Sequence, residues 1–66
     1  MNLVLNGEKR NMPGICTVSE LLDKLKLSSA PVLVEQNGQV VPRTQFAATN
    51  LADGDRVEIV RVVAGG

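Results

Sequence analysis

The 66-residue sequence contains no histidine, tryptophan or tyrosine, and Phe46 is its only aromatic residue. Histidine is the side chain that most often transfers protons near neutral pH, so Ser19, Ser28 and Ser29 have no imidazole to activate them as nucleophiles. One cysteine and no histidine also leave no ligand cluster for zinc. We therefore predict no internal catalytic residue, no metal site and no permanently bound cofactor.

The sequence also lacks a charge imbalance and a long apolar run. Seven Lys and Arg residues balance seven Asp and Glu residues, which gives a formal net charge of zero. With no basic field and almost no aromatic stacking surface, we expect no nucleic-acid partner. The start of the chain, Met1–Asn6, has no basic segment before an apolar one, so we expect neither a signal peptide nor a membrane span. These absences favour a cytoplasmic protein.

Two polar features need a decision between function and structure. Cys16 precedes a predicted helix, a position that favours a redox or sulfur-transfer thiol, but free cysteine mostly behaves as a small buried apolar residue, and we interpret it that way. It also stands where it would form an apolar contact with Leu21 across the helix start. Asp53 and Asp55 offer two carboxylates, too few oxygen ligands for a cation site, so we interpret Asp53-Gly54-Asp55 as a turn.

What the sequence does contain is a regular order of strand and turn signals. Met1–Leu5 alternates in polarity as a strand does, and Asn6-Gly7 is a strong hairpin signal. The other expected strands and turns follow the same reasoning: a weak strand over Glu8–Met12, a strand over Val32–Glu35, a turn at Asn37-Gly38, a short strand at Val40-Val41 that Pro42 stops, a helical turn around Gln45–Ala48, and a last strand over Arg56–Val63.

One helix is expected, from Thr17 to about Lys26. Thr17 and Glu20 have the spacing of a capping box, in which each side chain bonds the other residue's backbone N–H. Apolar residues follow at helical spacing, at Val18, Leu21, Leu22 and Leu25. A hairpin, a crossover helix and further strands predict an α+β fold of the β-grasp (ubiquitin-like) type. We expect one domain over residues 1–66, with a mixed sheet of four to five strands, the last parallel to the first, and the helix across one face.

The last strand carries the pattern closest to function. Val57 and Ile59 are expected to face the core, which leaves Val60 and Val62 outward. An outward apolar patch beside charged residues is typical of a partner-binding surface, so we predict that Val60, Val62 and Val63 form one. The alternative is that Val60 packs on a neighbouring strand or loop.

Ala64, Gly65 and Gly66 follow that strand. Small residues add little to a core, and these three are either a frayed end or a flexible functional tail. Extended, they reach on the order of 10 Å beyond Val63. A thread without Cβ atoms on its last two residues fits a narrow channel in a partner and can deliver a carboxylate there.

The chain resembles the thiamine-biosynthesis sulfur carrier (ThiS) family over nearly its whole length. The resemblance is carried by Met1–Glu8, Thr17–Leu22, Val34–Arg43, Asp53–Val60 and Val62–Gly66. The segment through Val41-Pro42-Arg43 is the more discriminating part, because a terminal Gly-Gly is shared with related families.

The resemblance implies a defined chemistry at Gly66. A ThiF-like adenylyltransferase would use ATP to form an acyl-adenylate there. A persulfide from a cysteine desulfurase or another donor would then replace AMP and leave a thiocarboxylate, which passes its sulfur to a ThiG-like thiazole synthase. The chain would thus be a protein co-substrate and not an enzyme.

Two other functions remain open at this point. The first is a sulfur carrier for molybdopterin synthesis, the small subunit of molybdopterin synthase, although that family tends to be longer and richer in aromatic residues. The second is a ubiquitin-like tag or a plain interaction module. The sequence does not identify the sulfur donor, the affinities for partners, the oligomeric state, service in more than one pathway, or a redox role of Cys16.

Overall fold

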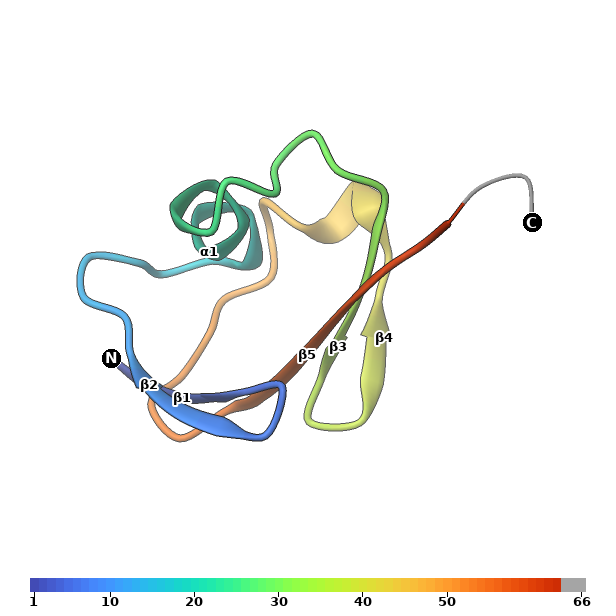
Figure 1. Cartoon of the computed structure of the whole chain (residues 1–66). Coiled ribbons are helices and arrows are strands. Elements are labelled where there is room, and N and C mark those ends of the chain that lie inside the picture. The colour runs from blue at the N-terminus through green and yellow to red at the C-terminus, as the bar shows by residue number, and fades with distance from the viewer. Residues whose placement is uncertain (64–66) are drawn as a thin grey trace.

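The structure is a computed structural model that describes residues 1–63 (Figure 1). Its elements follow the predicted order: β1 (Asn2–Leu5), β2 (Glu8–Asn11), α1 (Val18–Lys24), β3 (Val32–Gln36), β4 (Gln39–Val41), the 3-10 helix η1 (Arg43–Gln45) and β5 (Arg56–Arg61).

Both predicted hairpins are present. β1 pairs antiparallel with β2 through Asn6-Gly7, and β3 pairs antiparallel with β4 through Asn37-Gly38. The φ angles are 49° and 85° in the first turn and 50° and 84° in the second. Positive φ at both central residues matches the right-handed twist of the strands, and asparagine and glycine adopt it at the lowest cost. These turns fix which side of each strand faces the core.

The strands form one mixed sheet in the order β2-β1-β5-β3-β4, with α1 across one face (Figure 1). β5 lies in the middle, parallel to β1 and antiparallel to β3, which confirms the predicted β-grasp arrangement. The core between the sheet and α1 is made of aliphatic residues and one aromatic residue: Leu3, Leu5, Met12, Ile15, Val18, Leu21, Leu22, Val32, Val34, Val41, Phe46, Leu51, Val57 and Ile59.

The predicted start of α1 is confirmed and its predicted end is wrong. Glu20 N donates to Thr17 Oγ1 at 3.2 Å, and Thr17 N donates to Glu20 Oε1 at 3.1 Å, which completes the capping box. The helix ends at Lys24 because Lys26 adopts a left-handed conformation with φ 60°. The N–H of Lys26 then reaches Asp23 O (3.1 Å), as in a Schellman motif. Glycine usually occupies this position, so a lysine there does not mark the end of a helix in the sequence.

Two other predicted bounds shift for reasons involving proline. The helical turn begins at Arg43 rather than at Gln45, because Pro42 has the extended conformation of the residue before a helix (ψ 149°) and its carbonyl accepts from Gln45 N at 2.8 Å. β5 ends at Arg61 rather than at Val63. Val62 N donates to Pro31 O at 2.7 Å, but Pro31 has no N–H to return, so the ladder stops.

Our interpretation of Cys16 as a buried residue is wrong, because its side chain is exposed. Its backbone is held on both sides: Cys16 N donates to Glu20 Oε1 at 2.6 Å and Leu51 N donates to Cys16 O at 2.8 Å. Ile15, which is 4% exposed, fills the core at this junction instead.

Candidate functional site

β5 presents two faces of opposite character, as its sequence predicts. Val57 and Ile59 are buried against the core, at 0% and 9% exposure, while Glu58 and Val60 lie on the outer face of the sheet, away from α1. Because successive side chains of a strand point to opposite faces, this central strand both anchors the core and carries an outward surface.

The outer face is apolar at the end of β5 that leads to residues 64–66. We call the exposed apolar side chains at this end the tail-side patch; its members are Leu33 and Val60 on the outer face, and Val62 and Val63, which follow β5. Leu33 stands opposite Val60 in the register of β3 and β5, and Val60 is 55% exposed. The sequence did not single out Leu33, because every residue in Val32–Val34 is apolar and only the register shows which one faces outward.

The opposite end of this outer face is charged. Glu35 of β3 stands directly opposite Glu58 of β5, and Arg56 follows on the same side of β5. Like charges at facing positions in a sheet repel each other, so the two carboxylates favour a partner that brings positive charge. The outer face thus carries exposed apolar residues at one end of β5 and charged residues at the other.

The remaining predicted site residues, Ala64, Gly65 and Gly66, lie outside the described residues. The structure does show where the described chain leads into these three residues. β5 runs out to the side of the molecule away from α1, while the N-terminus lies on the opposite side (Figure 1). In the described chain, the last residue of the core is Ile59. The residues beyond β5 are thus joined directly to the tail-side patch.

Asp53 and Asp55 hold the turn before β5, as their interpretation predicts. Asp53 Oδ1 accepts from Asn2 N at 2.6 Å. Asp55 accepts from Gln36 Nε2 (2.8 Å), Asn37 Nδ2 (3.0 Å) and Ala52 N (2.9 Å), and so ties β5 to the turn between β3 and β4. Partial burial by itself would raise the pKa of Asp55, but the donors at Ala52, Asn37 and Gln36 outweigh it and hold that pKa below its ordinary value.

This lowered pKa predicts a loss of stability in acid. Because the pKa of Asp55 is lower in the folded than in the unfolded chain, its contribution to stability is complete above the ordinary aspartate pKa of about 4 and is lost as the pH falls through the folded pKa. Urea unfolding of the wild type and Asp55→Asn at neutral and acidic pH measures the effect. We expect the variant to be less stable than the wild type at neutral pH, and we expect the difference in their free energies of unfolding to become smaller in acid. A difference that does not depend on pH would contradict this account.

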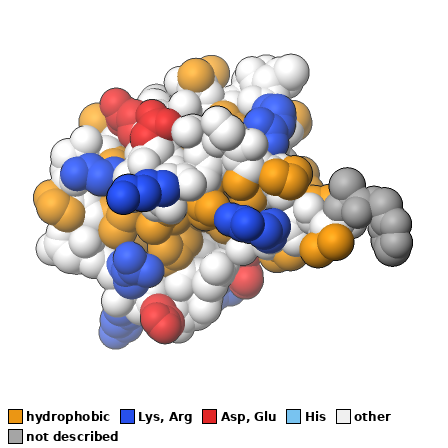
Figure 2. Space-filling view, turned by 45° about the horizontal axis from the view of Figure 1, so that its top comes forward, with side chains coloured by type: hydrophobic (Ala, Val, Ile, Leu, Met, Phe, Trp, Pro, Cys, Tyr) orange, Lys and Arg blue, Asp and Glu red, His pale blue; other side chains and the backbone are white. Residues whose placement is uncertain are grey.

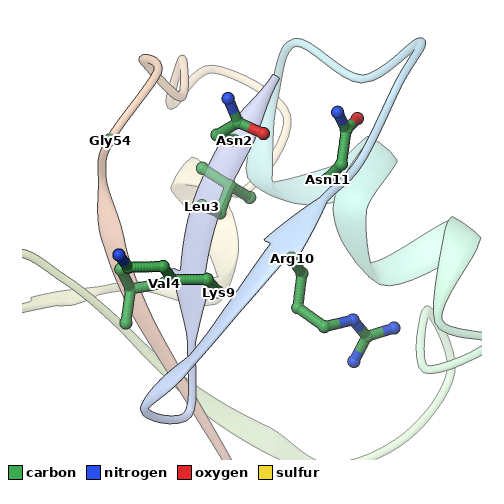
Figure 3. Close-up of a pocket in the computed structure, with 7 residues that line it drawn as sticks. All are labelled: Asn2, Leu3, Val4, Lys9, Arg10, Asn11 and Gly54. Carbon is green, nitrogen blue, oxygen red and sulfur yellow. The ribbon is translucent and has the colours of Figure 1, made fainter.

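A hollow of about 400 Å³ lies at the far end of the sheet and does not serve the tail. It is lined by Asn2, Leu3, Val4, Lys9, Arg10, Asn11 and Gly54 (Figure 3). Lys9 and Arg10 are neighbours on β2 and point to opposite sides of the strand, so their charges do not converge (Figure 3). Gly54 precedes β5, and the strand's length, on the order of 20 Å, separates this hollow from the tail.

Neither a metal site nor a membrane span was found in the described part of the chain. Residues 1–63 hold no group of three or more His, Cys, Asp or Glu side chains placed to bind a metal ion. Of the helices in the same residues, none has the length and apolar character needed to cross a bilayer.

Comparisons with known proteins agree on one family. The family model for the ThiS family matches residues 3–66. The sulfur carrier protein ThiS of Escherichia coli is 35% identical over 66 residues, which are 100% of both chains. A thiazole synthase of Paramagnetospirillum magneticum is 44% identical over the whole chain, which spans only 20% of that protein.

A solved structure supports the same assignment. The crystal structure of the thiamine biosynthesis protein ThiS from Geobacter metallireducens superposes with a TM-score of 0.86 at 43% identity and covers 100% of both chains. Family model, full-length relative and structure therefore coincide over the same residues that carry the β-grasp core and the tail-side patch. The chain belongs to the ThiS family.

Proposed function

We propose that the chain carries sulfur as a thiocarboxylate on Gly66 and donates it to the assembly of the thiazole ring of thiamine. As a ThiS family member, the chain is a sulfur carrier of thiamine biosynthesis. The observation that carries the proposal for Gly66 is the match with the E. coli carrier, which covers 100% of both chains, so that Gly66 aligns with the end of that protein.

The proposed chemistry follows from the poor reactivity of a carboxylate. Its negative charge repels nucleophiles and oxide is a poor leaving group, so a partner adenylyltransferase first joins the Gly66 carboxylate to AMP and releases pyrophosphate from ATP. A persulfide sulfur then attacks the acyl carbon and AMP leaves. A thiol reduces the resulting acyl disulfide, which frees the thiocarboxylate. Its sulfur is softer and more nucleophilic than the carboxylate oxygen.

In this scheme the partners supply the catalytic groups, and the chain is a co-substrate rather than an enzyme. In the proposed cycle it binds no permanent cofactor, since ATP belongs to the adenylyltransferase, and we propose that the cycle runs in the cytoplasm. The sulfur arrives from a cysteine desulfurase or another persulfide donor. The chain contributes a folded body for recognition and a narrow tail, Ala64–Gly66, for the reaction.

Thiazole synthase is the proposed acceptor of the sulfur. The P. magneticum protein of that name contains a segment 44% identical to the whole chain, and a thiazole synthase of Magnetococcus marinus contains one that is 36% identical. In both, the carrier-like segment covers 20% of the protein. A carrier and its acceptor within one polypeptide support a direct transfer between them.

The tail-side patch is the proposed docking surface for the adenylyltransferase. We expect Val60→Asp to weaken binding by about tenfold or more, because the contact would have to bury a charge. Isothermal titration calorimetry with the purified enzyme measures this. Val40→Asp is the matched control, since Val40 is equally exposed (56% against 55%) but lies on edge strand β4, outside the patch. Equal losses for the two variants, or none for Val60→Asp, would contradict a docking role of the patch.

The choice between pathways is tested by mixing the chain with each candidate synthase. We expect a complex with thiazole synthase on size-exclusion chromatography, and none with the large subunit of molybdopterin synthase. The reverse result would overturn the thiamine assignment. Isopeptide bonds between Gly66 and lysines of other proteins in the source cells would instead favour a tagging role.

A further inference from the structure

A second hollow, of about 270 Å³, opens on the helix side of the sheet. It lies between the C-terminal end of α1 and the strands, next to the end of β5. Its lining consists of Leu5, Asn6, Arg10, Leu25, Leu27, Val32, Ile59 and Arg61. Figure 2 shows apolar side chains gathered in the middle of this face, with Lys and Arg side chains beside them. We call this site the helix-end hollow.

The hollow exists because α1 is short and ends in a tight turn. The left-handed residue Lys26 turns the chain back, and Leu27 N donates to Leu22 O at 2.8 Å. This turn places Leu25 and Leu27 at the margin of the core, where both are only partly buried. β5 continues past that margin, and its last inward side chain, Arg61, is exposed.

The two arginines lie on the inner face of the sheet, which is mostly apolar but also carries Glu8, opposite Leu5, and Gln36, opposite Val57. Arg10 stands opposite Leu3 in the register of β1 and β2, and Arg61 stands opposite Val32 in that of β3 and β5; both partners are core residues. No Asp or Glu belongs to the lining of the hollow among the described residues. An inward charge on an edge strand such as β2 protects against aggregation, but β5 is a central strand, so this cause does not explain Arg61.

The backbone of β5 is also open toward the hollow. Asn6 N donates to Val57 O at 2.9 Å, and the Asn6 side chain continues the pairing by accepting from Ile59 N (2.8 Å) and donating to Ile59 O (3.2 Å). By the same alternation, the N–H and C=O of Arg61 point to the β1 side, but β1 has already turned away into its hairpin. An extended segment bound there can pair with Arg61 as an added strand.

We propose that the helix-end hollow binds a segment of the enzyme that receives the tail, and that this segment presents an apolar side chain next to a carboxylate. The hollow is smaller than the roughly 300–1,000 Å³ of small-molecule sites, which fits a side chain better than a cofactor. Two guanidinium groups without a lining carboxylate complement an Asp or Glu, for which arginine offers paired donors.

The position of Arg61 identifies which partner this is. Gly66 is only five positions further along the chain, so the reacting carboxylate lies at most about 18 Å from Arg61 in an extended chain. An enzyme that encloses Gly66 must therefore come close to the hollow. The inference rests on the proposed function in this respect alone: it takes the partner to be an enzyme that acts on the tail.

The test is the affinity of the full chain for the purified adenylyltransferase and for thiazole synthase, measured by calorimetry without ATP or a sulfur donor. Arg10→Glu and Arg61→Glu are each expected to weaken binding to at least one of the two enzymes by about tenfold or more, and the loss should shrink at high salt. Lys9→Glu is the matched control, because it makes the same charge change one residue away on the opposite face of β2. It should change the affinity less than about twofold.

A further variant tests the apolar floor, and the fold of every variant is checked by its thermal midpoint. Leu27→Ser keeps both arginines and should also weaken binding. Unchanged affinity of Arg10→Glu and Arg61→Glu for both enzymes would overturn the proposal. So would an Arg10-dependent self-association of the chain in sedimentation equilibrium, which would make a second copy the occupant.

The outcome separates this proposal from the function proposed for Gly66. If the arginine variants lose affinity while the wild type never gains a thiocarboxylate, the hollow is supported and the sulfur-carrier chemistry fails. If a thiocarboxylate forms normally while the affinities do not respond to Arg10→Glu and Arg61→Glu, the hollow fails and the chemistry stands.

Discussion

Removal of Gly66 is expected to abolish thiocarboxylate formation and to leave the fold intact. A chain that ends at Gly65 presents its carboxylate about 3.5 Å short of the position that the adenylyltransferase has evolved to hold, and a displacement of about 1 Å can already cost a hundredfold in rate. The core of the described chain ends at Ile59, so the thermal midpoint should not change. Intact mass after incubation with the adenylyltransferase, ATP and a sulfur donor measures the product.

The variant Gly66→Ala is the control for reach. It keeps the carboxylate at its full distance and adds only a Cβ, so we expect a slower reaction rather than none. If the shortened chain gains sulfur at the wild-type rate, Gly66 is not the site of modification. If it loses its fold, the account of the tail as independent of the core is wrong.

Leu22→Ala is expected to remove much of the stability of the domain. Leu22 is 2% exposed in the core under α1. Truncating a buried leucine costs about 2–5 kcal/mol, and a domain of this length has only about 3–10 kcal/mol in total. Urea denaturation monitored by circular dichroism measures the change in the free energy of unfolding. The variant should be partly unfolded at 37 °C if its loss lies at the upper end of that range.

The matched control for this prediction is Leu33→Ala, which makes the same truncation at a side chain that is 41% exposed on the outer face. We expect a loss below about 1 kcal/mol there. Equal losses for Leu22→Ala and Leu33→Ala would mean that the core does not lie between α1 and the sheet as described. The two variants also separate stability from binding, because Leu33 belongs to the tail-side patch.

The parts of the fold that depend on local chemistry could be predicted from the sequence. Asparagine-glycine pairs set both hairpin turns, and the Thr17 and Glu20 side chains set the start of α1. The end of α1 could not be predicted, because Lys26 adopts the left-handed conformation that glycine usually adopts after a helix. The burial of Cys16 was predicted wrongly, because its backbone bonds to Glu20 and Leu51 turn the side chain outward, and these depend on the neighbouring loop.

The candidate site, too, could be predicted from the sequence only in part. The alternation along β5 predicted that Val57 and Ile59 face inward and Val60 outward, as the structure confirms. The place of Leu33 beside Val60 depends on the strand register, which an all-apolar segment does not reveal. The helix-end hollow could not be predicted from the sequence either. Arg10 and Arg61 are far apart in the sequence, and only the order of the strands in the sheet brings them to one hollow. The role of Gly66 stays a prediction.

The central claim, that sulfur is carried on Gly66, is tested most directly by the intact mass of the protein isolated from its native cells under thiamine starvation. The account predicts a species heavier than the unmodified chain by one oxygen exchanged for sulfur, with fragmentation that assigns the exchange to Gly66. A population that carries no sulfur at Gly66 under this demand, or that carries it on Cys16 instead, would contradict the account.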